Sequence, residues 1–200
     1  MATAVKYKTI NDFLDLPEDS RAELIDGQIV YKAMASGTHA NIEGAISGLA
    51  RSLFHKTKKK NGQGGWWILP EVSVHFRKFE RILTPDITGW RREILPNCPT
   101  AYPVPDRPDW VCEVSHTTYK KDSTIVFETL QREGVSFYWI ANTDTRNLQV
   151  FELVDGRYVM AQSLFEDDGW QKVRPFESVQ MHMGMLFGAD EPEDPDSDPE

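Results

Sequence analysis

The chain of 200 residues is 40% hydrophobic and 26% charged, a composition typical of a globular protein with one core. It has no run near the roughly 18 apolar residues that a membrane span requires, so we expect no membrane partner. No apolar stretch at its N-terminus marks a secretory signal, and its two cysteines lack the spacing of metal ligands. We therefore expect a cytoplasmic protein. Seven acidic residues between positions 190 and 200 account for most of the net charge of −9, and the remaining charge of −2 neither supports nor excludes a nucleic-acid partner.

The N-terminal region predicts a short helix followed by a hairpin. Thr9 can cap a helix over residues 10–16, and Pro17 ends it. Residues 22–32 are predicted to form a hairpin around Asp26-Gly27, a dipeptide that favours a two-residue turn. We therefore expect two antiparallel strands before the first long helix.

The first long helix is predicted after Thr38, which is a suitable cap. Four apolar residues recur at helical spacing, and His39 begins the same face. These four are Ile42, Ile46, Leu49 and Leu53. Beyond them, the basic run of Lys56 and residues 58–60 is either a solvated helix end or a contact for phosphate.

The middle of the chain predicts strands. Residues 66–76 and 81–90 are expected to form two strands joined by a charged turn, and residues 91–108, with five prolines, an irregular excursion. Residues 110–114 then form a short apolar strand.

The C-terminal half predicts a helix capped by Asp122 and ended by Gly134. The apolar run 136–141 is typical of a strand buried on both faces, and a hairpin (148–153 and 158–161) follows it. Alternation of Val179, Met181 and Met183 indicates a last strand. The order of elements predicts an α/β fold with a mixed sheet flanked by helices, as a single domain over residues 1–187 with an acidic, disordered tail over residues 188–200.

Three carboxylates lie within or beside these apolar segments, where an unpaired charge is costly. They are Glu71, Asp86 and Glu113. Each alone could be satisfied by an arginine or by backbone amides. Two carboxylates that meet at about 4 Å repel each other by about 4 kcal/mol at an effective dielectric of 20, and a shared proton or a bound cation relieves this repulsion. Oxygen ligands favour Mg²⁺ or Mn²⁺ over zinc.

These residues carry a resemblance to a known family. Pro85-Asp86, followed 27 residues later by Glu113 in an apolar strand, resembles the PD-(D/E)XK nuclease superfamily, and further motifs resemble its Uma-two branch of restriction-endonuclease-like proteins, formerly a domain of unknown function. The resemblance covers residues 7 to 187. The further motifs are residues 12–18, 22–27, 37–39, 65–68, 108–114, 134–135 and 138–140.

The resemblance implies a restriction-endonuclease-like fold, here with an extra N-terminal hairpin, and hydrolysis of DNA phosphodiester bonds with Mg²⁺ or Mn²⁺. By position, Asp86 and Glu113 would hold the metal, and Glu71 would be a further ligand or would orient water. His39 would contact phosphate or a carboxylate, unless it is a core histidine. Glu23 lies in a family-typical segment, but a glutamate in a hairpin is often structural. A homodimer is also consistent with the family.

The chain departs from the family pattern at its lysine. The superfamily places a lysine two residues after the glutamate, where this chain has Ser115, and the Uma-two branch places it on the second helix, where this chain has Val126. Lys121 is the candidate to replace it, with Lys120 as a contact for nucleic acid. His116, three residues after Glu113, is a further candidate for a cation or a base.

Three functions therefore remain open. The first is a Mg²⁺-dependent DNA endonuclease, indicated by the three carboxylates. The second is a catalytically impaired nuclease scaffold that binds DNA or protein, indicated by Ser115 and Val126. The third is a metallohydrolase for small molecules on the same frame.

Overall fold

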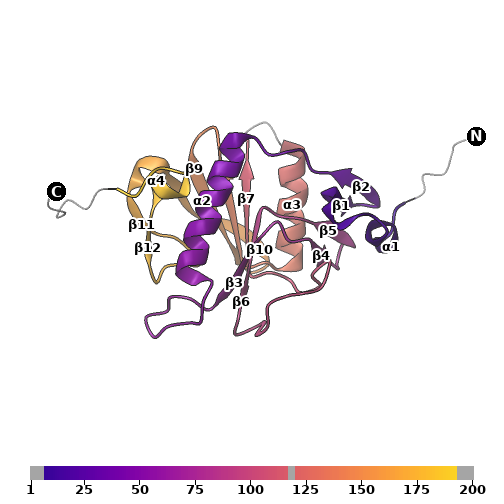
Figure 1. The fold of residues 1–200 in the computed structure, drawn as a ribbon, viewed down its shortest axis with the longest axis horizontal. Helices are drawn as coiled ribbons and strands as arrows, with labels where there is room; N and C mark the ends of the chain where they lie inside the picture. Colours follow the sequence, from indigo (N-terminus) through magenta and orange to yellow (C-terminus); the bar gives the residue numbers. More distant parts are fainter. Residues whose placement is uncertain (1–6, 117–119, 193–200) are drawn as a thin grey trace, which may run out of the picture.

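The computed structural model describes residues 7–116 and 120–192, with the backbone alone for residues 120–123. A six-stranded sheet in the order β10-β9-β8-β7-β6-β3 forms its centre (Figure 1). Neighbouring strands are antiparallel except β7 and β8, which are parallel and are connected through the helix α3 (Lys120–Glu133). The strands are β3 (Trp66–Pro70), β6 (Ile87–Arg91), β7 (Trp110–Ser115), β8 (Phe137–Asn142), β9 (Asn147–Val154) and β10 (Arg157–Phe165). This is the mixed α/β architecture that the sequence predicts.

Helices cover both faces of this sheet. The helix α2 (Gly37–Phe54) packs through Ile42 and Ile46 on the face that carries Trp110. On the other face, Leu130 of α3 packs near Val111. A strand between two apolar layers must be apolar on both sides, as β7 and β8 are. A polar side chain at the end of such a strand therefore lies at the edge of the apolar packing formed by α2 on one face and α3 on the other.

A second sheet, in the order β2-β1-β5-β4, lies beside the first. Its hairpin is the predicted one, with β1 (Ala22–Ile25) and β2 (Gln28–Tyr31) joined by Asp26 and Gly27, whose positive φ angles of 49° and 74° are those of a type I′ turn. The remaining elements at this end are α1 (Ile10–Leu14), capped by Thr9, the 3₁₀ turn η1 (Glu18–Ser20), β4 (Val74–Phe76) and β5 (Arg81–Leu83).

The prediction of two long strands over residues 66–76 and 81–90 is wrong, because each divides where the chain passes between the two sheets. Glu71 has a φ of 45°, in the left-handed region, so it cannot continue β3. The second break contains Pro85, which has no N–H to donate to a ladder. The two breaks lie side by side, since the Glu71 N–H donates to the Asp86 carbonyl at 3.0 Å.

The cap of α2 is Ser36, and the prediction of Thr38 is wrong by two residues. The Ser36 hydroxyl accepts a hydrogen bond from the His39 N–H at 3.2 Å, in the geometry of an N-cap. We expect Ser36→Ala to lower the free energy of unfolding by about 1 kcal/mol, because an amide of the first turn loses its acceptor. Thr38→Ala, an exposed substitution two residues away, should change it by less than about 0.5 kcal/mol. Urea unfolding of both variants measures the difference, and equal effects would contradict the assignment.

The other predicted boundaries are corrected by smaller amounts. The helix α3 begins at Lys120, before the predicted start at Asp122, whereas Gly134, with a φ of 84°, ends the helix as expected. The last strand is shorter than predicted, since Met183 already begins a helix. The C-terminal elements are η2 (Glu166–Asp168), β11 (Trp170–Lys172), β12 (Gln180–His182) and α4 (Met183–Leu186). Across the described ranges, every helix is too short or too polar to cross a lipid bilayer. Most of the predicted acidic tail, residues 193–200, lies outside the described residues.

Candidate active site

Asp86 and Glu113 face each other across two neighbouring strands. The last paired residues of β6 and β7 are Ile87 and Cys112, so the next step of the antiparallel register places Asp86 opposite Glu113. Both side chains line the same cavity, and the negative charge of Asp86 raises the pKa of Glu113. The structure therefore brings together two of the three carboxylates that the sequence singles out.

Asp86 is buried, with 3% of its surface exposed, and its carboxylate contacts a lysine, a histidine and a backbone amide. Its Oδ1 accepts a hydrogen bond from Lys32 Nζ at 3.0 Å, and its Oδ2 accepts one from the Val114 N–H at 2.8 Å. His39 Nε2 lies 3.4 Å from Oδ2. Burial alone would raise the pKa of Asp86, but the hydrogen bond from His39, the charge of Lys32 and the Val114 amide together lower it below its usual range. Asp86 is therefore ionised at neutral pH.

Glu113 is affected in the opposite direction. Burial raises the pKa of Glu113 well above its ordinary value, and the negative charge of Asp86 raises it further. The charge of Lys32 opposes this shift without cancelling it. The pair thus resembles two acids that share one proton, and a bound cation would take the place of that proton.

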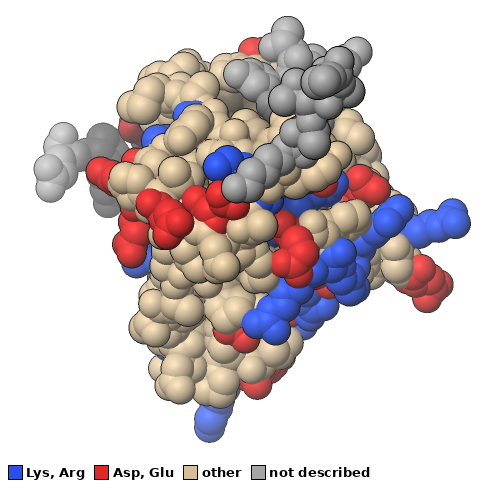
Figure 2. Space-filling model, turned by 90° about the vertical axis from the view of Figure 1, so that its right-hand side faces the viewer, with Lys and Arg blue, Asp and Glu red and all other residues tan. Residues whose placement is uncertain are grey.

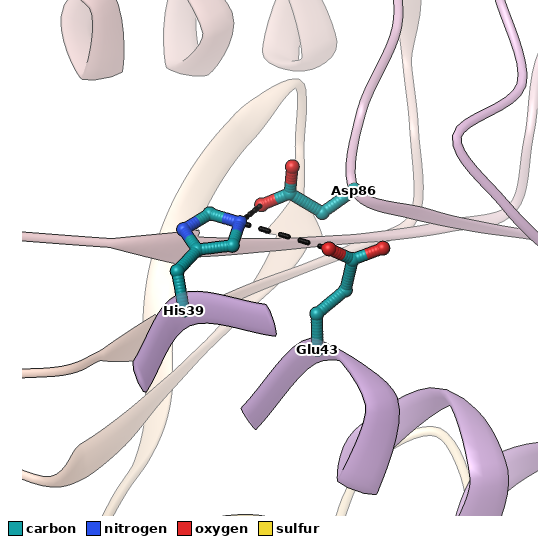
Figure 3. A group of neighbouring side chains, drawn as sticks. All are labelled: His39, Glu43 and Asp86. Atoms are coloured by element: carbon teal, nitrogen blue, oxygen red, sulfur yellow. Dashed lines mark ion pairs between the residues drawn. The ribbon is translucent and has the colours of Figure 1, made fainter. Parts of the chain in front are cut away.

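The helix α2 adds His39 and Glu43, one turn apart on the same face (Figure 3). His39 Nε2 lies 3.7 Å from Glu43 Oε2 as well as close to Asp86. The hydrogen bond to Asp86 raises the pKa of His39, despite the opposing effect of burial, and burial together with the charges of Asp86 and Glu71 raises the pKa of Glu43. Of the two open interpretations of His39, the structure shows the contact with a carboxylate.

These residues form a donor set that fits a metal ion. One ligand atom each of His39, Glu43 and Asp86 lies within 4.8 Å of the others. The neighbouring Glu113 adds a third carboxyl group, and Lys32 is the cation in direct contact with Asp86. When all three carboxyl groups are ionised, they carry more negative charge than Lys32 and a protonated His39 together neutralise. A divalent cation among them would restore the balance.

Glu71 is placed apart from this group. It follows β3 in the left-handed conformation, and its carboxylate forms an ion pair with Arg21 at 3.1 Å with about half of the side chain exposed. Its charge contributes to the raised pKa of Glu43, but no atom of Glu71 belongs to the cluster of metal-ligand atoms found in the described residues.

A cavity of about 410 Å³ opens beside the acids, between the β1–β2 hairpin, the start of α2, the end of β7, and α3. Ser115 and Val126, the two positions where the resemblance places a lysine, both line it. His116 lies at its wall and bonds Thr143 Oγ1 at 2.6 Å. The side chains of Lys120 and Lys121 lie outside the described part of the chain.

Lys32 also lines this cavity, and the sequence did not single it out. Its Nζ donates to the Thr84 carbonyl at 2.7 Å in addition to Asp86. Burial would lower the pKa of Lys32, but the charges of Glu113 and Asp86 raise it above its ordinary value, so the ammonium stays charged. Glu23, on the facing strand of the hairpin, accepts a hydrogen bond from the Thr84 N–H at 2.7 Å. Two side chains of the hairpin region, those of Glu23 and Lys32, therefore bind the backbone of Thr84, two residues before Asp86.

The charged surface of the molecule is mixed rather than uniformly basic on the face that carries the hairpin. Lys and Arg side chains form a band there, with Asp and Glu side chains among them (Figure 2). The basic run at Lys56 and residues 58–60 follows the C-terminal end of α2, the opposite end from His39, and Lys58 forms an ion pair with Glu93 at 3.6 Å. This run is therefore remote from the candidate site.

Comparison with known proteins gives one family and one fold. The family described as "Uma2: Putative restriction endonuclease" matches residues 10–184. A crystal structure of "a putative nuclease belonging to DUF820" from Anabaena variabilis ATCC 29413 is similar, with a TM-score of 0.71 and 21% sequence identity over 90% of this chain and 97% of that one. The comparison with curated proteins found no match.

Proposed function

The chain belongs to the Uma2 family of restriction-endonuclease-like proteins, and from this we propose that it is a divalent-metal-dependent endonuclease that hydrolyses DNA phosphodiester bonds. One observation supports this proposal above all. Asp86 and Glu113, from neighbouring strands, line one cavity together with His39 of α2, and Glu43 of the same helix lies beside His39 and Asp86. A buried group of acids of this kind is stable only with protons or cations between its members.

The residues have separate tasks in this proposal. Asp86 and Glu43 would hold the metal through oxygen atoms and His39 through one nitrogen, and Glu113, which lines the same cavity as Asp86, would be a further oxygen ligand. A divalent cation in such a site polarises the phosphate and lowers the pKa of a bound water, which makes a nucleophile near neutral pH. The amide of Val114 fixes Asp86 Oδ2, so the ligand is oriented before any metal arrives.

The donor set also bears on which ion is bound. Three carboxylates are ligands that both Mg²⁺ and Mn²⁺ accept, whereas an imidazole nitrogen suits Mn²⁺ better than Mg²⁺. His39 lies close enough to Asp86 to share an ion with it. We therefore propose Mg²⁺ or Mn²⁺ as the cofactor, with the tighter binding for Mn²⁺.

Cleavage of supercoiled plasmid by the purified full chain tests the proposal. We expect open-circular product with Mn²⁺ or Mg²⁺, and none after EDTA removes the metal, because the acids alone cannot activate water. Calorimetry with Mn²⁺ should show binding in the same buffer. Absence of metal binding would refute the proposal, while binding without cleavage would favour the impaired scaffold.

A further inference from the structure

Hydrolysis of a phosphodiester develops negative charge on the attacking oxygen and on the non-bridging phosphate oxygens. A fixed cation that touches these oxygens stabilises the transition state more than the ground state. Within the side chains that the structure describes, the two positions at which the resemblance places such a cation are Ser115 and Val126, and neither can carry charge. The cation that reaches the acids comes from a different element.

That cation is Lys32, which follows the last residue of β2. Its Nζ lies 3.0 Å from Asp86 Oδ1, and Glu113 lines the same cavity as Lys32. The lysine side chain is 23% exposed and borders the cavity. An ammonium has three N–H donors, and Lys32 uses two of them on described partners, Thr84 and Asp86. The third donor can serve a ligand in the cavity.

The backbone around Lys32 is fixed on both sides. Its N–H donates to the Arg21 carbonyl at 2.9 Å, which extends the pairing of the hairpin by one residue. The Thr84 carbonyl accepts a hydrogen bond from the Lys32 ammonium, and the Thr84 N–H donates one to Glu23. The ammonium therefore has a defined position relative to Asp86 before substrate binds, as electrostatic stabilisation of a transition state requires.

We propose that Lys32 is a catalytic residue of this site and occupies the role for which Ser115 and Val126 are unsuited. The proposal rests on the nuclease function proposed above. In the step, the oxygen of a water forms a bond to phosphorus, and the bond from phosphorus to the leaving sugar oxygen breaks. One water proton reaches the leaving oxygen through solvent and the other stays on the product phosphate. Lys32 keeps its proton and donates a hydrogen bond to the attacking oxygen or to a phosphate oxygen.

The competing interpretation is that Lys32 is only a counter-ion for Asp86. A counter-ion contributes to stability and to the geometry of the acids, so its loss would change metal binding or folding. A catalytic cation contributes to the chemical step after metal and substrate have bound. Metal affinity and the single-turnover rate therefore separate the two interpretations.

The experiment uses the full chain with Lys32→Met, Lys32→Arg and, as a matched control, Lys172→Met on the exposed surface of β11. Mn²⁺ affinity is measured by calorimetry, folding by thermal unfolding, and cleavage of a DNA duplex under single-turnover conditions at saturating Mn²⁺. We expect Lys32→Met to bind Mn²⁺ within about threefold of the wild type or more tightly, and to cleave about 100-fold more slowly. Lys32→Arg should recover part of the rate, and Lys172→Met should equal the wild type.

Other outcomes overturn the proposal in distinguishable ways. Cleavage by Lys32→Met within about threefold of the wild-type rate leaves the nuclease function standing and makes Lys32 a counter-ion. Loss of Mn²⁺ binding in that variant gives Lys32 a role in building the metal site alone. A wild type that binds Mn²⁺ and does not cleave refutes both proposals together. If Lys32→Met fails to fold, Lys32→Gln, which keeps a donor for Thr84 without the charge, supplies the same comparison.

Discussion

Replacing Asp86 by Asn should abolish measurable Mn²⁺ binding and reduce DNA cleavage by about a thousandfold, or about 4 kcal/mol at the transition state. Asp86 is the residue on which the site converges, since Lys32, His39 and the Val114 amide all contact its carboxylate. Asparagine keeps the shape of the side chain and an oxygen for the Val114 amide, but it removes the charge that attracts a cation. Calorimetry and plasmid cleavage measure the two effects on the same preparation.

Asp109→Asn is the matched control for this substitution. Asp109 is also a buried aspartate, with 2% of its surface exposed, and its Oδ2 accepts a hydrogen bond from a backbone amide, that of Arg91, beside the same pair of strands. It lies before β7, whereas Glu113 lies near the end of that strand. The Asp109 variant should bind Mn²⁺ and cleave like the wild type. Equal loss of activity in both variants would show that burial, and not the site, explains the effect of Asp86→Asn.

Glu113→Gln should have two opposite effects. Metal-dependent cleavage should fall by several hundredfold or more, because a metal ligand and its charge are lost. The metal-free protein should become more stable, since glutamine removes the repulsion between Glu113 and the ionised Asp86. We expect the thermal midpoint to rise by a few degrees, as about 1 kcal/mol shifts the midpoint of a protein of this size by about 2–4 °C.

The gain in stability should depend on pH. The pKa of Glu113 is raised by burial and by Asp86 above its ordinary value of 4.5, so above pH 4.5 the folded protein binds a proton that the unfolded chain has released. Stability of the metal-free wild type therefore falls as pH rises from 4.5 through the raised pKa, and Glu113→Gln should lack this component. Asp86, whose pKa is lowered from 3.8, acts in a separate window, because its stabilisation is lost as pH falls below 3.8.

Thermal unfolding of both proteins in EDTA between pH 4 and pH 9 gives the comparison. The difference between their midpoints should grow with pH and should close when Mn²⁺ is added to the wild type, because a bound cation replaces the proton. A difference that stays constant with pH would mean that Glu113 is satisfied by hydrogen bonds at every pH. The proposed role of Glu113 as a metal ligand would then lose its physical basis.

Local patterns in the sequence predicted most of the fold. The Asp26-Gly27 turn, the apolar stripe of α2 and the stop at Gly134 each depend on a few neighbouring residues, and the structure has all three. The strands around Glu71 and Pro85 were predicted as continuous because alternation does not show where a chain leaves one sheet for another. That information lies in contacts between residues far apart in sequence.

The sequence predicted part of the candidate site. Asp86 and Glu113 stand out because a carboxylate in an apolar strand is unusual. Glu43 does not stand out, since an acid on an amphipathic helix is usually solvated, and its spacing of four residues from His39 is the one signal that could have identified it. Lys32 is 54 residues from Asp86 and ends a hairpin strand, so nothing local connects it with the acids.

The joint between the two sheets has a consequence for how variants of this protein are interpreted. The four-stranded sheet presents Lys32 and Glu23, the six-stranded sheet presents Glu113, and Asp86 stands on the segment that crosses from one to the other. The arrangement is therefore as dependent on the alignment of two scaffolds as on any single side chain. Random mutagenesis should yield inactive proteins with every acid intact, and hydrogen exchange at the amide of Thr84, which donates to Glu23, would show which of them have lost that alignment.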